Sequence, residues 1–520
     1  MKEIVILTVS DIHGYIFPTD YQEAHQDLPK GLLKINQMIQ DIKQTHEHVI
    51  VMDNGDFLQG SPLCSYLASE TKSSKPLTDL YNQIGFDFGV IGNHEFNYGL
   101  PYLYDAIKSL NYPVLSANIF KDHQPFTGND VIYLEKDKTT FGIIGLTTQY
   151  IPHWEKPDTI AELSFQSAVE TAKELIPEVR RNADIVVVCY HGGFERDLHT
   201  GEETELLTGE ETELLTGENE GYALLTELED VDVLITGHQH REIAEVINQT
   251  AVIQPGGKGD CLGKITLKID EETNKVLSAD SELLFVKDYQ PQISIPQSLT
   301  NLEKEINDWL DTKISQQSQT MYVDDHFKAR IEPHPLINFI NYAQMKLSGA
   351  DISASALFDS GVGFGQTITM RDVINNYPFP NTFYVLDITG KDLLLALERT
   401  ASYFDIEQGK LVVNKAFIEP KPQHYNYDMY AGISYTFNIQ KPIGNRVENV
   451  LFKGKPIELD AHYSIVLNNY RAVGGGDFNM YSADKIIKDI QVEGAEMLID
   501  FLEQHSMEDV PEVMNFEVKY

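Results

Sequence analysis

The stretch Ile4-Val5-Ile6-Leu7-Thr8-Val9 is an unbroken, mostly apolar run, and Ser10-Asp11-Ile12-His13 follows it directly. Short continuous runs of this kind are typical of strands that are buried on both faces of a parallel sheet. The same pattern, an apolar run with polar residues at its carboxyl end, recurs at residues 49–56, 88–95, 185–193 and 233–240. The five segments together predict an α/β fold.

The polar residues after these runs are candidate metal ligands. Loops at the carboxyl ends of neighbouring strands converge on one crevice, so residues far apart in sequence meet there. A mixture of carboxylates, imidazoles and an amide suits Mn, Fe, Zn or similar ions rather than Ca or a thiolate site. Any one of these residues alone is more often an ordinary hydrogen-bonding residue, but five such segments in order favour a metal centre. The candidates are Asp11, His13, Asp56, Asn93, His191, His238 and His240.

The residue types also indicate which ligand two metal ions would share. Two divalent ions about 3.5–4 Å apart need a common ligand, and a carboxylate can bridge where an imidazole cannot. Asp56, central in the order of ligands, is the predicted bridge. We expect one ion to be completed by Asp11, His13 and His240, and the other by Asn93, His191 and His238.

The motifs resemble the signature of the calcineurin-like metallophosphoesterases. They are Asp11-x-His13, Gly55-Asp56-x-x-x-Gly60, Gly92-Asn93-His94-Glu95, His191 and Gly237-His238-x-His240. Their order and spacing resemble the two-domain bacterial 5′-nucleotidase family, over nearly the whole chain. The resemblance implies a four-layer α/β/β/α phosphoesterase domain, two divalent metal ions, and a smaller α/β C-terminal domain that binds the nucleotide substrate.

The chain is expected to divide into three parts. A β-rich run ends near Phe285-Val286-Lys287, so the phosphoesterase domain is predicted to cover residues 1–290. Residues 291–325 form a predicted connector with a linker helix from Leu302 to about Ile314. The nucleotide-binding domain then covers residues 326–520 and contains an apolar helix at Pro335–Leu347.

Two aromatic residues beside glycine-containing turns are candidates for base recognition. Tyr427 precedes Gly432, and Tyr470 precedes the run Gly474-Gly475-Gly476-Asp477. Two rings can sandwich a nucleobase, each stacked ring contributing roughly 1–3 kcal/mol. An aromatic beside a turn is more often a core residue, but both positions match base-clamping aromatics of the family; Tyr425 is close enough to be confused with Tyr427. Asp477 could accept hydrogen bonds from ribose hydroxyls.

The sequence departs from true 5′-nucleotidases at two places. Asn97 stands where those relatives have an aspartate three residues after the catalytic histidine, here His94. The glycine-rich stretch at 357–365 has no arginine before Arg371, where relatives grip a 5′-phosphate. Both changes are similar to the 2′,3′-cyclic-nucleotide 2′-phosphodiesterase/3′-nucleotidase branch, and this activity is the predicted function. His94 and Asn97 are the predicted catalytic residues, with His94 stabilising the transition state or protonating the leaving oxygen.

Three alternatives remain open from the sequence. A 5′-nucleotidase would differ in its preference for AMP over 3′-AMP. A cyclic-dinucleotide phosphodiesterase would need a groove beyond one base site. A non-catalytic nucleotide-binding protein is expected to have lost ligands, and all seven candidates are present.

Composition limits the partners and the compartment. A net charge of −39 argues against nucleic-acid polymers and anionic membranes as partners, and no feature implies a protein partner. Three cysteines without C-x-x-C spacing argue against a disulfide framework. Because Asp11 interrupts the first apolar run, no signal-peptide core is recognisable, and a cytoplasmic location is expected.

A short repeat interrupts the predicted first domain. Thr200–Leu207 is repeated verbatim as Thr208–Leu215, and a partial third copy begins at Thr216-Gly217-Glu218. Two and a half copies of eight residues are too short for a solenoid, whose units have twenty or more residues. We interpret the repeat as a duplication in a surface loop, where added length costs little.

Overall fold

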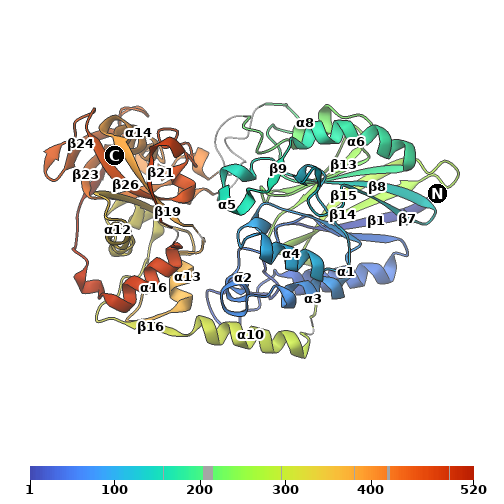
Figure 1. The fold of residues 1–520 in the computed structure, drawn as a ribbon, viewed down its shortest axis with the longest axis horizontal. Helices are drawn as coiled ribbons and strands as arrows, with labels where there is room; N and C mark the ends of the chain where they lie inside the picture. Colours follow the sequence, from blue (N-terminus) through green and yellow to red (C-terminus); the bar gives the residue numbers. More distant parts are fainter. Residues whose placement is uncertain (156, 203–214, 294, 380, 419–421, 491) are drawn as a thin grey trace. The chain divides into compact units, whose positions relative to one another are not determined.

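The computed structural model describes residues 1–155, 157–202, 215–293, 295–379, 381–418, 422–490 and 492–520. The chain forms two compact units, and the division falls between Asn307 and Asp308. This position lies inside the predicted connector, residues 291–325. Figure 1 shows the strands and helices of each unit.

The first unit contains two six-stranded sheets and a small third one. The first sheet has the order β15 (Val276–Phe285), β14 (Cys261–Ile269), β1 (Lys2–Val9), β2 (Val49–Asp53), β3 (Phe88–Val90), β4 (Val114–Leu115). The second has the order β12 (Glu242–Ile247), β13 (Thr250–Pro255), β11 (Val233–Thr236), β10 (Ile185–His191), β8 (Thr139–Thr147), β7 (Val131–Lys136). The third contains β6 (Gln124–Pro125), β5 (Ile119–Lys121) and β9 (Leu163–Phe165).

The two large sheets pack face to face and helices cover their outer faces. Ile4 and Ile6 of β1 share a buried core with Phe141 and Val187 of the second sheet. Figure 1 shows α1, α3 and α4 on one side of the sheets and α6 and α8 on the other, which confirms the four-layer α/β/β/α architecture. The helices are α1 (Leu32–Thr45), α2 (Pro62–Tyr66), α3 (Lys75–Ile84), α4 (Leu100–Ser109), α5 (Pro157–Ile160), α6 (Ala168–Asn182), α8 (Gly221–Thr226) and α9 (Val286–Tyr289).

All five apolar runs form strands, and their pairing explains why their ends meet. β1 pairs in parallel with β2, with Val9 opposite Asp53, and β2 pairs in parallel with β3. In the second sheet β10 pairs in parallel with β8 and with β11, with Tyr190 opposite Thr236. Paired parallel strands that end in register bring the residues that follow them to the same edge.

The second unit is built around a five-stranded mixed sheet and a four-stranded sheet. The first has the order β22 (Asp428–Ala431), β17 (Ile352–Ala356), β26 (His462–Asn468), β19 (Phe383–Thr389), β27 (Ile486–Ile490). The second has the order β25 (Lys455–Pro456), β24 (Val447–Phe452), β23 (Ile433–Asn438), β28 (Phe516–Lys519). Two further sheets have two strands each: β16 (Lys313–Gln316) with β18 (Thr367–Thr369), which are far apart in sequence, and the hairpin of β20 (Phe404–Glu407) with β21 (Lys410–Val413). The helices are α11 (His326–Ile331), α12 (Pro335–Ser348), α13 (Met370–Asn376), α14 (Gly390–Ala401), α15 (Asn469–Ala472) and α16 (Gly494–Gln504).

Helix α10 (Gln297–Leu310) differs from the predicted linker helix. It begins after Pro296, five residues earlier than predicted, and it ends before Ile314, which belongs to strand β16. The prediction extended the helix too far because an apolar residue at helical spacing can equally well enter a strand. By contrast, the predicted helix at Pro335–Leu347 is confirmed as α12.

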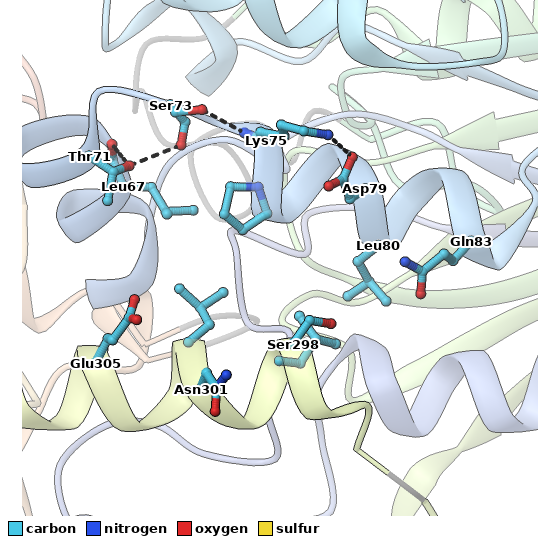
Figure 2. Close-up of a pocket in the computed structure, with 13 residues that line it drawn as sticks. Leu67, Thr71, Ser73, Lys75, Asp79, Leu80, Gln83, Ser298, Asn301 and Glu305 are labelled. Atoms are coloured by element: carbon cyan, nitrogen blue, oxygen red, sulfur yellow. Dashed lines mark hydrogen bonds and ion pairs between the residues drawn. The ribbon is translucent and has the colours of Figure 1, made fainter.

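A hollow of about 420 Å³ lies in the first unit beside α10. Figure 2 shows Leu67, Leu80 and Ser298 on its walls and the Lys75–Asp79 ion pair at its edge. None of its lining residues belongs to the candidate ligands. Elsewhere in the described residues, all three cysteines are buried and unpaired, and no helix has the length and hydrophobicity needed to cross a membrane.

Candidate metal centre

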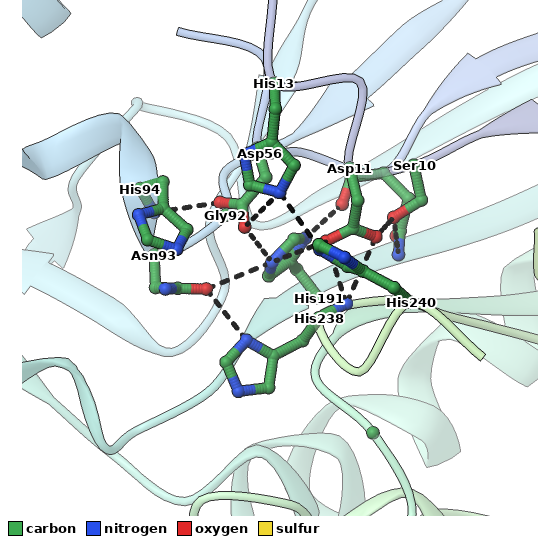
Figure 3. Close-up of polar contacts among 12 residues, drawn as sticks. Ser10, Asp11, His13, Asp56, Gly92, Asn93, His94, His191, His238 and His240 are labelled. Atoms are coloured by element: carbon green, nitrogen blue, oxygen red, sulfur yellow. Dashed lines mark hydrogen bonds and ion pairs between the residues drawn. The ribbon is translucent and has the colours of Figure 1, made fainter. Parts of the chain in front are cut away.

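The candidate ligands converge at the carboxyl ends of the central strands of both large sheets. Asp11 and His13 follow β1, Asp56 follows β2, and Asn93 follows β3. From the second sheet, His191 is the last residue of β10, and two further histidines follow β11. Figure 3 shows all seven side chains around one centre: Asp11, His13, Asp56, Asn93, His191, His238 and His240.

The side chains separate into two groups that could each hold one ion. One is Asp11, His13 and His240, and the other is Asp56, His191 and His238, with the ligand atoms of each group within 4.8 Å of one another. Asn93 Oδ1 lies 3.2 Å from His191 Nε2 and 3.0 Å from His238 Nδ1, so it adjoins the second group. The grouping agrees with the division expected from the sequence.

Asp56 lies between the two groups. Its Oδ2 atom is 3.1 Å from His191 Nε2 in one group and 3.9 Å from His13 Nε2 in the other. Its second oxygen, Oδ1, accepts a hydrogen bond from the backbone N–H of His94, at 2.8 Å. The carboxylate is therefore held in place by one oxygen, while the other faces both groups, as a bridging ligand requires.

Several ligands have an unusual backbone conformation. Asp11, Asp56, His238 and His240 have φ values of 55°, 59°, 67° and 53°, in the left-handed region. Such residues cost of order 1–3 kcal/mol each and cluster at functional sites, where surrounding contacts enforce them. With this backbone conformation, the four side chains face the centre at the strand ends.

Gly92 permits the close approach of the β2 and β3 loops. A Cβ atom at this position would lie 2.2 Å from Asp56 Oδ1 and 2.6 Å from Asp56 N. Any side chain here would displace the predicted bridging carboxylate. The glycine of the Gly92-Asn93-His94-Glu95 motif is thus a steric requirement of the site.

Hydrogen bonds on the outer side of the rings orient the ligand nitrogens. His13 Nδ1 lies 2.8 Å from the carbonyl oxygen of Gln59, and His191 Nδ1 lies 2.5 Å from that of Asn54. A carbonyl oxygen can only accept, so each Nδ1 donates its proton and Nε2 of the neutral ring presents a lone pair. Both Nε2 atoms face the centre, as metal-ligating histidines do.

The arrangement of acceptors fits divalent cations. His13 Nε2, which presents a lone pair, lies 3.0 Å from His240 Nε2, and Asp56 Oδ2 lies 3.1 Å from His191 Nε2. A cation among these buried atoms would accept their lone pairs together. Carboxylate, imidazole and amide ligands match Mn, Fe, Zn or similar ions, and the two candidate groups match a pair of them.

The charges of the two carboxylates control the neighbouring histidines. Burial alone would lower the pKa of His191, but Asp56 and Asp11 outweigh burial and raise this pKa to about 10. Burial lowers the pKa of His13 to about 3, against the opposing effect of Asp56. In the absence of a cation, a proton on His191 therefore compensates the buried negative charge, which is the role that bound metal would take over.

Glu95 has a structural role that sequence reasoning did not assign. Its buried carboxylate accepts hydrogen bonds from the backbone N–H groups of Asp56, Phe57 and Gly92, at 2.9, 2.6 and 2.6 Å. It therefore ties the loop after β2 to the loop after β3. Burial and the charge of Asp56 raise the pKa of Glu95. The signal available in the sequence was its place beside Asn93 and His94.

His94 lies beside the metal groups but belongs to neither. Its Nδ1 is 2.7 Å from Asn97 Oδ1, and Asn97 Nδ2 donates to the carboxylate of Glu155. Because the Glu155 carboxylate fixes which end of the amide faces His94, Asn97 Oδ1 accepts and His94 Nδ1 donates. Asn97 therefore orients the His94 ring. Glu155, which the sequence did not indicate, adds a carboxylate that contacts Asn97 on the side away from His94.

The third copy of the repeat departs from the surface location that we predicted. Glu218, in Thr216-Gly217-Glu218, is fully buried, and its Oε1 lies 2.8 Å from His238 Nε2. The prediction of an exposed loop is therefore wrong for this copy. Residues 203–214, which hold most of the two full copies, lie outside the described residues. The sequence did not distinguish Glu218 from the glutamates of the other copies, because copies with the same sequence can make different tertiary contacts.

In the second unit, the assignment of Tyr427 as a base-stacking residue is wrong. Its ring is fully buried and packs against Tyr403 and Phe404, with ring centroids 4.5 and 5.2 Å away. Its hydroxyl donates to the carbonyl oxygen of Arg330 at 2.8 Å. Tyr427 is therefore a core residue, and a base could not reach its face.

Tyr425, two residues before Tyr427, is the tyrosine that lies beside Tyr470. The rings of Tyr425 and Tyr470 are both partly exposed, with centroids 6.4 Å apart and planes inclined by 67°. A base sandwich needs nearly parallel rings about 7 Å apart, twice the usual carbon contact distance, so the rings would have to turn to admit a base. Asp477, the predicted ribose ligand, lies 3.1 Å from Arg399 Nη2 in an ion pair.

Four arginines of the second unit are paired with carboxylates. Arg330 pairs with Asp359 at 3.1 Å, and Arg371 pairs with Asp311 at 2.9 Å. The other two pairs are Arg399 with Asp477, and buried Arg471 with Asp428 at 2.7 Å. Their positive charges are therefore largely neutralised within the protein.

Comparisons with known families agree with both units. Residues 4–242 match the calcineurin-like phosphoesterase family, and residues 313–483 match the 5′-nucleotidase C-terminal domain. A crystal structure from Staphylococcus aureus, provisionally described as a 5′-nucleotidase and solved with α-ketoglutarate, is 50% identical. The two chains cover each other completely, with a TM-score of 0.93.

Two more distant relatives carry names for different nucleotide activities. A 2′,3′-cyclic-nucleotide 2′-phosphodiesterase/3′-nucleotidase of Salmonella typhimurium is 27% identical over 91% of this chain and 82% of its own length. A trifunctional nucleotide phosphoesterase of Bacillus subtilis is 26% identical over 96% of this chain, which spans only 37% of that protein. The chain therefore belongs to the calcineurin-like phosphoesterases that carry a 5′-nucleotidase C-terminal domain, and it hydrolyses nucleotide phosphoesters.

Proposed function

We propose that the protein is a 2′,3′-cyclic-nucleotide 2′-phosphodiesterase with 3′-nucleotidase activity. The observation that carries the proposal is the pairing of the arginines of the second unit. Four of the five are paired with carboxylates, and the guanidinium of the fifth, Arg446, donates to backbone carbonyl oxygens. A 5′-nucleotidase needs cationic groups that hold a terminal 5′-phosphate, and bidentate arginine is the usual choice. The name of the Salmonella relative supports the same activity.

The reaction would proceed in two hydrolytic steps. In the first, a water oxygen bonds to phosphorus and the bond from phosphorus to O2′ breaks, leaving a 3′-phosphate. In the second, water attacks phosphorus again, the bond to O3′ breaks, and a nucleoside and inorganic phosphate leave. Each leaving oxygen takes up a proton. A pair of divalent ions held by the seven ligands would supply an activated water and neutralise charge on the phosphoryl oxygens.

His94 is the residue proposed to protonate the leaving oxygen. Its Nδ1–H is held by Asn97 Oδ1, so Nε2 is the nitrogen available to give a proton when the ring carries two. The ring lies beside the site, its centroid 5.2 Å from that of His13. Glu155 accepts a hydrogen bond from the amide of Asn97 and so stabilises the orientation of His94 indirectly.

The second unit is proposed to recognise the base through Tyr425 and Tyr470. Both rings are partly exposed, and flat aromatic surfaces stack on any nucleobase. If the protein holds the nucleotide by its base, a phosphate ester at either the 2′,3′ or the 5′ side of the ribose could be presented for hydrolysis. This mode of recognition is compatible with cyclic and 3′-phosphates.

A 5′-nucleotidase is the second candidate. It is favoured by the 50% identity to the Staphylococcus aureus protein over the full length of both chains. The two candidates differ in which ester of the same nucleoside is cleaved, so the base and the ribose can be held constant in the test.

Purified protein with Mn²⁺, Mg²⁺ or Zn²⁺ should be assayed on AMP, 3′-AMP and 2′,3′-cyclic AMP. We expect higher kcat/KM for 2′,3′-cyclic AMP and 3′-AMP than for AMP. Faster hydrolysis of AMP than of 3′-AMP would contradict the proposal and favour a 5′-nucleotidase. Bis(p-nitrophenyl) phosphate, which has no base or ribose, reports on the metal centre alone and distinguishes an inactive preparation from a different specificity.

A further inference from the structure

His238 is held between two side chains that contact its two nitrogens. Its Nδ1 lies 3.0 Å from Asn93 Oδ1 at the centre of the site, and its Nε2 lies 2.8 Å from Glu218 Oε1 on the outer side. The side chains of His238 and Glu218 are 1% and 0% exposed. The Glu218 contact is therefore part of the buried interior and not a surface ion pair.

The chemistry of this contact determines where the lone pair of His238 lies. A carboxylate only accepts, so Nε2 donates its proton to Glu218 and the neutral ring presents the lone pair of Nδ1. That lone pair then faces Asn93 Oδ1, another acceptor, which is the arrangement that a cation between them would satisfy. Glu218 therefore selects the tautomer in which His238 is ready to bind metal.

Glu218 differs from the groups that orient the other rings. The outer nitrogens of His13 and His191 contact backbone carbonyl oxygens, of Gln59 and Asn54. A carboxylate carries a full negative charge, so it makes the ring a stronger donor to a cation than a neutral carbonyl does. The second metal group, which contains His238, thus has a charged support.

The backbone around Glu218 is fixed by the sheet beneath it. Its carbonyl oxygen accepts hydrogen bonds from Thr148 Oγ1 at 2.6 Å and from the Tyr190 hydroxyl at 3.1 Å. The next residue, Asn219, accepts from the backbone N–H of Gly193 through Oδ1 at 2.9 Å. Glu218 is therefore held before any ion binds, as a positioning residue must be.

The first copy of the repeat provides an internal comparison. In Thr200-Gly201-Glu202 the Glu202 N–H donates to Thr200 Oγ1 at 3.2 Å, and in Thr216-Gly217-Glu218 the Glu218 N–H donates to Thr216 Oγ1 at the same distance. Gly201 and Gly217 have φ values of 70° and 84°. The two copies form the same local turn, yet Glu202 is exposed and Glu218 is buried against His238.

We propose that Glu218 is a positioning residue of the metal centre, which holds His238 in the tautomer and orientation that bind the ion of the Asp56–His191–His238 group. The repeat would thus connect directly to the site through its third copy. The inference rests on the metal centre of the proposed function, but it is independent of which nucleotide is cleaved.

The test measures metal binding by the metal-free protein. Glu218→Ala should weaken binding of one of two Mn²⁺ ions by roughly 10- to 100-fold, the usual effect of losing an outer hydrogen bond to a ligand. Binding of the other ion should change little. Glu218→Gln should lie between wild type and Glu218→Ala, because its amide oxygen still accepts from Nε2. Isothermal titration calorimetry, with metal content measured after dialysis, gives both affinities.

Two controls separate positioning from a general loss of structure. Glu202→Ala removes the equivalent glutamate of an identical turn at the surface and should leave both affinities unchanged. In the His238→Ala background, Glu218→Ala should have no further effect on metal binding, because its action passes through His238. The absorption spectrum of the Co²⁺ form of Glu218→Gln should also differ from that of wild type.

Unchanged affinity for both ions in Glu218→Ala would overturn the proposal, as would equal losses in the Glu202→Ala control. A further loss upon adding Glu218→Ala to His238→Ala would contradict action through the ring. If Glu218→Ala does not fold, Glu218→Gln decides: wild-type affinities and an unchanged Co²⁺ spectrum would again overturn it. Substrate preference does not enter any of these measurements, so failure here is distinguishable from failure of the proposed function.

Discussion

The candidate ligands of the first unit and the candidate base-stacking tyrosines of the second unit differ in how well the sequence could place them. The polar ligands lie at the ends of paired parallel strands, so sheet register alone brings them together. Tyr425 lies in a single turn of 3-10 helix and Tyr470 in the short helix α15. Two residues of sequence separate the core ring of Tyr427 from the partly exposed ring of Tyr425. Topology therefore locates a residue at a strand end, whereas only packing decides which ring of a short helical segment is exposed.

The largest effect is expected from replacing Asp56, the predicted bridging ligand. Asp56→Asn should lose most bound metal and reduce kcat by more than about 100-fold, beyond the usual effect of an outer-shell change. The reason is that a neutral amide does not bridge two cations. Metal content and hydrolysis of bis(p-nitrophenyl) phosphate check this result. A variant that keeps two ions and near-normal turnover would show that the two groups are not joined through Asp56.

His94 tests whether proximity to the site implies ligation. His94→Asn should retain both ions while kcat falls by roughly 10²–10⁴-fold, as expected for loss of a general acid. The backbone N–H of residue 94, which contacts Asp56, remains in the variant. Metal analysis alongside kcat separates the two roles, and loss of an ion would make His94 a ligand.

The tyrosines test the second half of the comparison. Tyr470→Ala and Tyr425→Ala should each raise KM for nucleotides roughly 5- to 150-fold, from a loss of about 1–3 kcal/mol of stacking. Hydrolysis of bis(p-nitrophenyl) phosphate, which has no base, should change far less. Equal losses on both substrates would contradict a role in base recognition.

Tyr427 is the matched control for these variants. Tyr427→Phe removes the hydrogen bond to the Arg330 carbonyl and should lower the free energy of unfolding by about 0.5–1.5 kcal/mol. KM for nucleotides should remain unchanged, because the ring is buried. Thermal unfolding and steady-state kinetics measure the two effects separately. A large rise in KM without loss of stability would restore Tyr427 as a substrate ligand.

The short apolar runs and the residues that follow them were sufficient to predict an α/β fold and the positions of the candidate ligands. The four-layer architecture was implied by the resemblance to the calcineurin-like metallophosphoesterases. The sequence was insufficient where a residue acts through tertiary contact alone. Glu155 and Glu218 come from loops distant in sequence from Asn97 and His238, and no local pattern relates them. The predicted end of helix α10 was wrong for a similar reason, because Ile314 belongs to strand β16, which pairs with the distant strand β18.

Glu155 offers a smaller effect that sharpens the picture of His94. Glu155→Gln should reduce kcat about tenfold, since a hydrogen bond to a charged group contributes about 1.5–3 kcal/mol and only part of it acts on the ring. KM and metal content should stay the same. Asn97→Asp in the same background restores a carboxylate next to His94 and should recover part of kcat. No change in kcat for Glu155→Gln would show that Asn97 alone fixes the ring.

The smallest effect is expected from shortening the repeat, although residues 208–214 lie outside the described residues. Deleting Thr208–Leu215 joins Leu207 to Thr216, so the eight residues before Glu218 keep the same identities. The change in loop-closure free energy is below about 0.6 kcal/mol, the value for a doubling of loop length. Melting temperature, kcat and metal affinity should therefore be nearly unchanged.

Deleting both full copies, Thr200–Leu215, should behave differently. A single Thr-Gly-Glu turn would remain, and it would have to serve two places. One is beside Asp197, whose N–H donates to the Glu202 carbonyl at 2.8 Å, and the other is against His238. We expect this longer deletion to weaken metal binding as Glu218→Ala does, whereas the shorter one does not. If both deletions leave metal binding unchanged, the contact between Glu218 and His238 does not depend on the length of the repeat. If both weaken it equally, the second copy is not dispensable.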